Sequence, residues 1–350
     1  MARITGEGLS FDDVVMIPKY NKIHSRKEVK FKTRVTRNYE IDIPIIAANM
    51  DTICETQMAI SLGKLGGLGV IHRFMTIEEQ AKQVEEVKKN NLIVAAAIGV
   101  KDAEKRLEAL VKSGVNIVVI DIAHGHSKYA GKTLDFIKKN YPHIDVMAGN
   151  IATKDAAEYF LSKNADAVKV GVGPGSLCTT RLMAGAGVPQ LTAIMDVYEA
   201  TKGEIPICAD GGIKNPADLT KAIGAGANTI MSGYLFAGTQ ETPGEIMEKN
   251  GKKFKIYRGS ASYDVSVKKA ELDGNKDKEI ISVEGEKTIV PYKGPIELIV
   301  KKFLGGLASG MTYIGAKEMK NIIGKADFNR VTSAGVEEGR THGVFEENCF

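Results

Sequence analysis

Long apolar runs, clustered cysteines and a large excess of charge are all missing from this sequence of 350 residues. No stretch approaches the roughly 18 apolar residues that a membrane span needs, so we expect no membrane partner. The opening residues, MARITGEGLSFDD, lack the apolar core of a secretory signal. A formal net charge of +4, from 47 basic and 43 acidic residues, argues against nucleic acid as a partner.

The four cysteines are Cys54, Cys178, Cys208 and Cys349. They form no CxxC pair, and no histidine lies at a spacing suited to zinc. Their scatter predicts a protein of the reducing cytoplasm.

The most informative segment is Gly171–Arg181, which reads GVGPGSLCTTR. Its glycines permit turns that other residues resist, and they leave backbone groups uncovered for an ion or a phosphate. Cys178 stands on this segment among serine and threonine hydroxyls. The alternative is a small buried thiol, which describes most free cysteines. Its neighbours favour an exposed nucleophile.

Short apolar runs recur along the chain, each followed by a segment of helical spacing. The expected strands are Pro44–Ala48, Leu68–Ile71, Ile93–Ile98, Ile117–Ile122, Asp145–Ala148, Ala167–Val170, Ile205–Ala209 and Thr229–Ser232. Expected helices include Thr76–Lys89, with a capping box from Thr76 and Glu79, Asp102–Ser113 and Asn215–Ala225. Such runs suit parallel strands that are covered on both faces. Eight βα units between about 44 and 250 predict an α/β fold, the (β/α)8 TIM barrel.

The pattern changes after Gly251. Residues 268–287 are highly charged and show neither helix nor strand periodicity, Pro291–Gly294 marks a turn, and Pro295–Leu307 again has helical spacing. The insertion at about 260–290 is either a surface loop, which composition favours, or a lid over the barrel. The end, Ser333–Phe350, is polar. We expect one catalytic domain over 1–350, with the helix and tail at 295–350.

Active sites of this fold lie where the strands end, and polar residues and glycines follow the strands here. A carboxylate such as Asp210 can bind the two hydroxyls of a ribose, while Gly211 and Gly212 let a phosphate approach backbone N–H groups. Gly233 lies in the next strand-end loop, which this fold also uses for phosphate. The alternative for Asp210 is a helix cap.

Two other strand ends carry ionisable groups. Asp121-Ile122-Ala123-His124-Gly125-His126-Ser127 contains a carboxylate and two imidazoles, which is weak support for a metal. We favour Asp121 as a contact to a second polar ligand, with the histidines orienting the loop. His72 and Arg73 are suited to an anion, although an exposed basic pair is usually only solvated.

Seven motifs together resemble the IMP dehydrogenase/GMP reductase family. They are DDVVMIP at 12–18, AANMDT at 47–52, GGLGVIHR at 66–73, DIAHGHS at 121–127, the segment at 171–181, ADGGI at 209–213 and VPYKGP at 290–295. The resemblance implies a TIM barrel whose cysteine bonds covalently to C2 of a purine nucleotide while hydride passes to or from a nicotinamide. It also implies a homotetramer.

Three departures favour the reductase branch of this family. No Arg-Tyr pair, which dehydrogenases use to activate water, occurs between Ser262 and Val290. Glu284 precedes VPYKG at the spacing of the reductase lid glutamate, which with Thr180 protonates the departing ammonia. Lys89–Leu92 directly closes the gap where dehydrogenases usually carry CBS modules, so none is expected here. This branch converts GMP to IMP with NADPH.

The resemblance also assigns residues. Catalysis falls to Cys178, Thr180 and Glu284. Substrate contacts are Met50, Ser176, Asp210, Gly212, Gly233, Tyr257, Gly259, Ser260 and Gly285. Cofactor contacts are Arg73, Asp121, Ala123 and Gly171, with Arg73 suited to the extra phosphate of NADPH. Carbonyls of Gly171, Gly173 and Cys178 form a candidate K⁺ site.

Some features are closer to the dehydrogenase branch. They include MTIEEQ after GGLGVIHR and SAGVEEGRTH near the C-terminus, while Ile281 replaces a lid arginine of many reductases and Ser260 replaces a common methionine. An NAD-dependent IMP dehydrogenase without CBS modules is therefore the first alternative. A non-catalytic purine-nucleotide-binding barrel is the second, and it predicts that replacing Cys178 leaves function intact.

Overall fold

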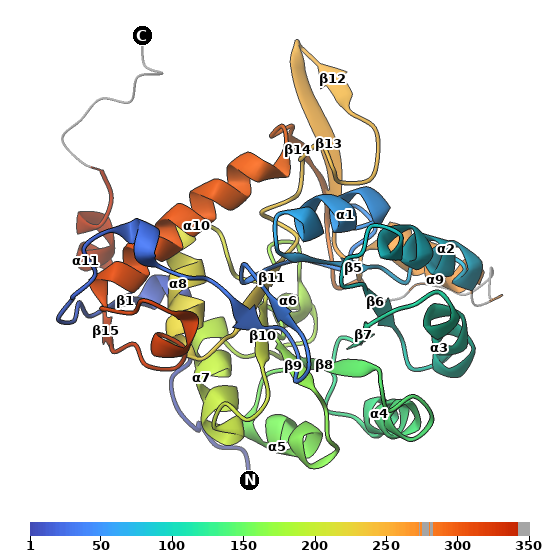
Figure 1. Ribbon diagram of the computed structural model, residues 1–350, viewed down its shortest axis with the longest axis horizontal. Coiled ribbons are helices and arrows are strands. Elements are labelled where there is room, and N and C mark those ends of the chain that lie inside the picture. The colour runs from blue at the N-terminus through green and yellow to red at the C-terminus, as the bar shows by residue number, and fades with distance from the viewer. Residues whose placement is uncertain (273, 275–279, 281–282, 342–350) are drawn as a thin grey trace.

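Eight parallel strands close into a barrel in the computed structural model, which describes residues 1–272, 274, 280 and 283–341 (Figure 1). The strands are β4 (Ile45–Ala47), β5 (Leu68–Ile71), β6 (Ala95–Ile98), β7 (Ile117–Asp121), β8 (Asp145–Ile151), β9 (Ala167–Val170), β10 (Ile207–Asp210) and β11 (Thr229–Ser232). Pairing of β11 with both β10 and β4 closes the circle. The predicted TIM barrel is confirmed.

Helices surround the barrel and alternate with its strands (Figure 1). They are α1 (Thr56–Lys64), α2 (Ile77–Lys88), α3 (Ala103–Lys112), α4 (Lys128–Asn140), α5 (Lys154–Ser162), α6 (Thr180–Met183), α7 (Gln190–Thr201), α8 (Pro216–Ala225) and α10 (Ile296–Tyr313). The last runs beyond the predicted end at Leu307. Glycines permit close packing of α10 on α8, because a Cβ at Gly306 would lie 2.2 Å from Pro216.

Local capping residues fix where the predicted helices begin. The Thr76 hydroxyl accepts from the Glu79 backbone N–H at 3.1 Å, and the Glu79 carboxylate accepts from the Thr76 N–H at 2.9 Å. This reciprocal pair is the capping box that the sequence predicts for α2. Asn215 caps α8 through the N–H groups of Ala217 and Asp218.

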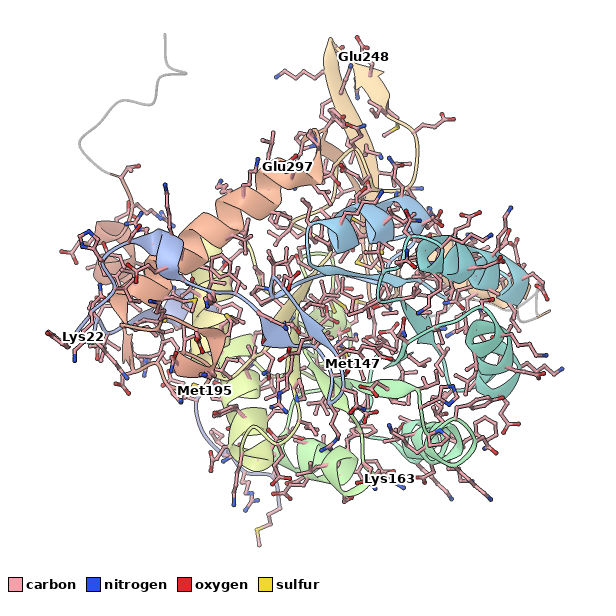
Figure 2. All side chains as sticks on the ribbon, in the orientation of Figure 1. Lys22, Met147, Lys163, Met195, Glu248 and Glu297 are labelled. Atoms are coloured by element: carbon pink, nitrogen blue, oxygen red, sulfur yellow. The ribbon has the colours of Figure 1, made fainter. Side chains whose placement is uncertain are left out.

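Side chains alternate between the barrel interior and the layer beneath the helices. In β7, Ile117 and Val119 belong to the interior cluster, whereas Val118 and Ile120 pack with the helices. Met147 lies at the centre of the barrel (Figure 2). A hairpin of β2 (Thr33–Arg34) and β3 (Glu40–Ile41) adds Val35 and Ile41 to the interior cluster, so it contributes to the same core.

The segment after the eighth strand is more ordered than the sequence predicts. It contains β12 (Met247–Lys249), β13 (Lys252–Arg258), α9 (Tyr263–Leu272) and β14 (Lys287–Pro291), and the three strands form an antiparallel arm (Figure 1). Glu248 lies on the projecting part of this arm (Figure 2). The prediction of no regular structure across 268–287 is wrong at both ends of that range, because α9 reaches Leu272 and β14 begins at Lys287.

A strand near each end of the chain pairs with the other beside the barrel. β1 (Val14–Met16) pairs with β15 (Phe328–Arg330), and a short helix, α11 (Ser333–Glu338), follows. Short 3-10 helices lie at Phe11–Asp13, Arg26–Glu28 and Met319–Asn321. The end of the predicted polar tail, Cys349 and the proposed Ile281 departure lie outside the described residues. Among the residues described, no helix has the length and apolar character to cross a membrane.

Candidate active site

A cavity of about 710 Å³ opens where the barrel strands end. We call it the central cavity. Every residue to which the family resemblance assigns a role contributes to its lining: Met50, Arg73, Asp121, Ala123, Gly171, Gly173, Ser176, Cys178, Thr180, Asp210, Gly212, Gly233, Tyr257, Gly259, Ser260, Glu284 and Gly285. The fold thus brings together residues that are far apart in the sequence.

The cysteine loop, residues 171–181, presents an exposed thiol to this cavity. Gly173 has a φ of 87°, and a Cβ there would lie 2.6 Å from the Arg181 side chain. Glycine is therefore required at this turn. The Cys178 N–H donates to the Gly175 carbonyl at 3.0 Å, which holds the nucleophile candidate on a tight turn. The buried-thiol alternative applies to Cys54 and Cys208, whose side chains lie in the core.

A hydrogen-bonded chain leads from the thiol to a carboxylate. The Cys178 thiol donates to Thr180 Oγ1 at 3.1 Å, and the Thr180 hydroxyl donates to Glu284 Oε2 at 2.7 Å. Backbone contacts fix this approach, because the Thr179 N–H donates to the Glu284 carbonyl at 3.0 Å. The arrangement can carry a proton from sulfur to carboxylate or return it.

The segment that supplies Glu284 is a lid over the central cavity. We define the lid as the described residues 259–272 and 283–291, which include α9 and β14. Its cavity-lining residues are Gly259, Ser260, Ala261, Val265, Ser266, Lys269, Glu284 and Gly285. For these described residues the surface-loop interpretation that composition favours is wrong, because backbone hydrogen bonds of Glu284 hold them against the cysteine loop.

One end of the cavity offers neutral hydrogen-bonding groups around glycines. Ser176 Oγ and Tyr257 Oη lie 3.0 Å apart, and a Cβ at Gly233 would lie only 2.6 Å from Met50 Sδ. Burial raises the pKa of Tyr257 to about 12, so its hydroxyl keeps its proton at neutral pH. Hydroxyls and uncovered backbone at a strand end suit a phosphate group.

The cavity lining also contains a charged cluster that the sequence does not reveal. Lys169 is 2% exposed, and its ammonium donates to Asp121 at 3.0 Å and to Asp210 at 2.8 Å. It also donates to Asn150 Oδ1, while Asn150 Nδ2 donates to Asp210 at 3.0 Å. The one signal in the sequence is a lysine inside the apolar run AVKV, a pattern that by itself predicts only a strand.

Lys169 and Asp121 stay ionised in this cluster. Burial disfavours the charged ammonium, but Asp210 and Asp121 outweigh this effect and raise the pKa of Lys169. Burial likewise opposes ionisation of Asp121, but Lys169 and Arg73 lower its pKa below the usual value. Asp210 is thus held facing the cavity by Lys169 and Asn150. The helix-cap alternative for Asp210 is wrong, because Asn215 caps α8.

The two residues of the basic pair have different environments. His72 is 1% exposed, and it contacts Glu55 at 3.1 Å and accepts from the Phe74 N–H at 3.1 Å. The interpretation of an exposed solvated pair is therefore wrong, and His72 does not line the central cavity. Arg73 does, with Nε 3.9 Å from Asp121 Oδ2.

The histidines that follow β7 point to no shared ligand in the described structure. His124 and His126 are exposed, and the ring of His126 lies 5.3 Å from that of Tyr159. Across the described residues, no group of three or more histidine, cysteine or carboxylate side chains has a geometry for metal binding.

A closed parallel barrel with an exposed cysteine, a hydrogen-bonded chain from that cysteine to a carboxylate and a glycine-lined cavity is an arrangement typical of a (β/α)8 enzyme, and it is suited to covalent catalysis. The comparisons with known proteins are more specific. The chain belongs to the IMP dehydrogenase / GMP reductase domain family, whose match spans residues 8–342. Members of this family are oxidoreductases of purine metabolism.

Similar proteins carry both names. The chain is 40% identical to an inosine-5'-monophosphate dehydrogenase of Borreliella burgdorferi, over 98% of each sequence. It is 33% identical to a GMP reductase of Leishmania donovani, over 97% of each. A crystal structure of a Trypanosoma brucei GMP reductase variant in complex with guanosine 5'-monophosphate has a TM-score of 0.91 at 31% identity, covering 97% of this chain and 98% of that one.

Chain length does not separate the two activities. The alignment with the Leishmania donovani reductase spans 478 positions, many more than this chain has residues, so that relative carries extra segments. The absence of a CBS module here, as its size shows, is consequently compatible with either name.

Proposed function

We propose that this protein is a GMP reductase, which converts GMP to IMP and ammonia at Cys178. The observation that carries the proposal is the chain from the Cys178 thiol through Thr180 to Glu284, with distances of 3.1 Å and 2.7 Å. A thiol that can pass its proton to a carboxylate becomes a nucleophile, and the same carboxylate then holds a proton for the leaving group.

The proposed first half-reaction releases ammonia. The thiol proton moves through the Thr180 hydroxyl to Glu284, and the thiolate attacks C2 of the guanine ring. A C2–S bond forms while the C2–N bond to the amino group breaks. Glu284 returns the proton through Thr180 to that nitrogen, which makes ammonia a better leaving group. The nucleotide then remains covalently attached to Cys178.

The second half-reaction would need a hydride at C2, which NADPH would supply when bound. Release of IMP as the C2–S bond breaks would leave Cys178 as a thiolate, and a proton from water would restore the thiol. Asp121, Ala123, Gly171 and Arg73 line the part of the central cavity that would hold the nicotinamide side. The lining fits such a group, because the Asp121 carboxylate can accept from a ribose hydroxyl and the Arg73 guanidinium beside it can bind a phosphate.

The nucleotide is proposed to lie with its phosphate between Ser176, Gly212, Gly233 and Tyr257. Its ribose would reach Asp210, whose orientation Lys169 and Asn150 fix at 2.8 and 3.0 Å. Met50, Gly259, Ser260 and Gly285 would border the base. A carboxylate fixed in this way can accept hydrogen bonds from both ribose hydroxyls, which favours a ribonucleotide.

Potassium is proposed at the cysteine loop, on the carbonyls of Gly171, Gly173 and Cys178. The Gly171 carbonyl already accepts from Asn150 Nδ2 at 2.7 Å, so one of its two lone pairs is used and the other is available to a cation.

Oxidation of IMP with NAD is the second candidate, favoured by the 40% identity with an IMP dehydrogenase. That reaction needs a group to activate water on the lid, and no arginine occurs between residues 259 and 329. The lid therefore supports the reductase over the dehydrogenase.

One assay separates the two candidates. Purified protein is incubated with GMP and either NADPH or NADH, and in parallel with IMP and NAD⁺. We expect NADPH consumption, with IMP and ammonia formed in equal amounts, and no XMP in the parallel reaction. XMP formed from IMP at a comparable rate would contradict the proposal and support the dehydrogenase.

A further inference from the structure

A chain of alternating charges joins the barrel to the lid just outside the central cavity. The Arg258 guanidinium at the end of β13 binds the Asp51 carboxylate through Nε at 2.9 Å and through Nη2 at 2.5 Å. On its other side, Arg258 Nη1 lies 3.5 Å from Asp264 Oδ2, and Lys287 Nζ lies 2.5 Å from the same oxygen. Neither Arg258 nor the two aspartates line the cavity.

The barrel side of this chain is buried at Asp51 and partly buried at Arg258. The Asp51 side chain is 3% exposed, and that of Arg258 is 24% exposed. Asp51 follows Met50, which lines the cavity, and the Arg258 backbone N–H donates to Thr52 Oγ1 at 3.3 Å. A two-point contact between guanidinium and carboxylate fixes direction as well as distance, which a lysine cannot do. The fork therefore anchors β13 to the loop after β4.

The lid side leads towards the catalytic carboxylate. Asp264 lies in the first turn of α9, and Lys287 pairs opposite Arg258 in the ladder between β13 and β14. The hydrogen bond from Lys287, and then the positive charges of Lys287 and Arg258, lower the pKa of Asp264, so this link stays ionised. Lys287 follows closely on Glu284, whose N–H donates to the Ala261 carbonyl at 3.2 Å.

We infer that Arg258 is a positioning residue that holds Glu284 against Thr180. It touches neither the nucleotide site nor the cysteine. Its contacts with Asp51 and Asp264 instead tie both sides of the lid to the barrel, and the 2.7 Å contact between Thr180 and Glu284 depends on that tie. The inference rests on the proposed function, because it concerns the proton that Glu284 exchanges.

The test measures kcat, KM and nucleotide affinity for Arg258→Lys, Glu284→Gln and the double variant. Arg258→Lys keeps the charge but loses the fork, and we expect kcat to fall about tenfold while GMP affinity changes by less than about threefold. If Arg258 acts through Glu284, the double variant is no slower than Glu284→Gln alone. Asp264→Asn, which breaks only the lid contact, should lower kcat in the same direction.

Arg330→Lys is the matched control. Arg330 also makes a two-point contact, with Glu7 at 2.6 and 3.0 Å, but both side chains are 62% exposed and lie away from the cavity. We expect kcat of this variant to equal that of the wild type.

Two outcomes would overturn the inference. If the fold reduction of kcat in the double variant equalled the product of the reductions in the two single variants, Arg258 would not act through Glu284. A loss of GMP affinity at unchanged kcat would place its effect on the Met50 loop instead. A wild type that oxidises IMP but does not reduce GMP would overturn the proposed function, and the same double-variant comparison on that reaction would still test the tie.

Discussion

The barrel strands and the lid both contribute to the central cavity, but different interactions hold them in place. Strand β7 is covered on both faces, with Val118 and Ile120 fully buried. In α9 only Val265 and Ala270 are buried, and the lid is fastened by backbone hydrogen bonds and ion pairs. Burial specifies a strand locally, whereas the lid takes its place from contacts with the barrel.

This difference separates two kinds of functional residue. Cys178, Asp210 and Lys169 belong to strands or strand-end loops of a closed barrel, so their positions are set by the core. Glu284 is set by how the lid meets the cysteine loop, through the 3.0 Å contact of its carbonyl with the Thr179 N–H. We therefore expect large and direct effects from barrel residues, and smaller, geometry-dependent effects from lid residues.

The largest effect is expected at the cysteine. Cys178→Ala removes the nucleophile, and kcat should fall by at least about 1,000-fold, while GMP affinity stays within about threefold. Steady-state turnover and calorimetric binding of GMP measure both. Retained activity would instead support the non-catalytic barrel. It would also contradict the expectation that barrel residues have larger effects than lid residues.

Lys169→Met tests the charged cluster of Lys169, Asp121 and Asp210 in the barrel. It leaves the carboxylates of Asp121 and Asp210 without their shared cation in a buried site, and it should lower the free energy of unfolding by about 3–5 kcal/mol. Urea denaturation of the two proteins provides the measurement. Lys163→Met, at a lysine that pairs with Asp135 on the exposed face of the helices, is the control and should change stability by less than about 1 kcal/mol. Equal stability of all three proteins would contradict the account of this cluster.

Glu284→Gln tests the lid. The amide cannot exchange the proton, and we expect kcat to fall by roughly 100-fold without loss of GMP affinity. Glu286→Gln, two residues further along the lid and absent from the cavity lining, is the matched control and should retain wild-type turnover. If both variants behaved alike, Glu284 would be only one more charge on the lid.

Tyr257→Phe gives the smallest effect, because the barrel groups around the phosphate remain. Loss of its contact with Ser176, and with a bound phosphate, should weaken GMP binding by about 1–2 kcal/mol. The variant also tests a pH dependence. The pKa of Tyr257 is raised from 10.0 to about 12, so the unfolded chain loses this proton first.

That difference fixes the sign. Between about pH 10 and 12 the folded protein binds more protons at this residue than the unfolded chain does, so stability falls as pH rises through this window. Unfolding curves across the window should show a smaller decline for Tyr257→Phe than for the wild type. An identical decline would mean that the tyrosine is not buried as described.

Much of the barrel and of the site could be predicted because its signals are local. Buried parallel strands are continuous apolar runs, and GVGPGSLCTTR combines turn glycines with a cysteine. Glu284 was found only by its spacing from VPYKG in the family resemblance. The sequence does not predict α9 or the three-stranded arm. In α9 only two residues are buried, so charged residues such as Lys268 leave too few apolar positions to form a helical pattern.

The remaining omissions involve pairs that are distant in sequence. Lys169 reads as one polar residue in a strand until Asp121 and Asp210 are brought beside it, and His72 reads as exposed until Glu55 packs against it. A charged group can be buried only where a partner compensates its charge. That partner is distant in sequence, so no local pattern predicts it.

The central claim is that a purine becomes bonded to Cys178 with release of ammonia, and mass spectrometry of the protein mixed with GMP alone tests it most directly. Without a hydride donor the reaction should stop after its first half. The account predicts a nucleotide adduct on the peptide that contains Cys178, together with an equal amount of ammonia, and neither in Cys178→Ala. Free ammonia with no adduct, or an adduct on another residue, would contradict it.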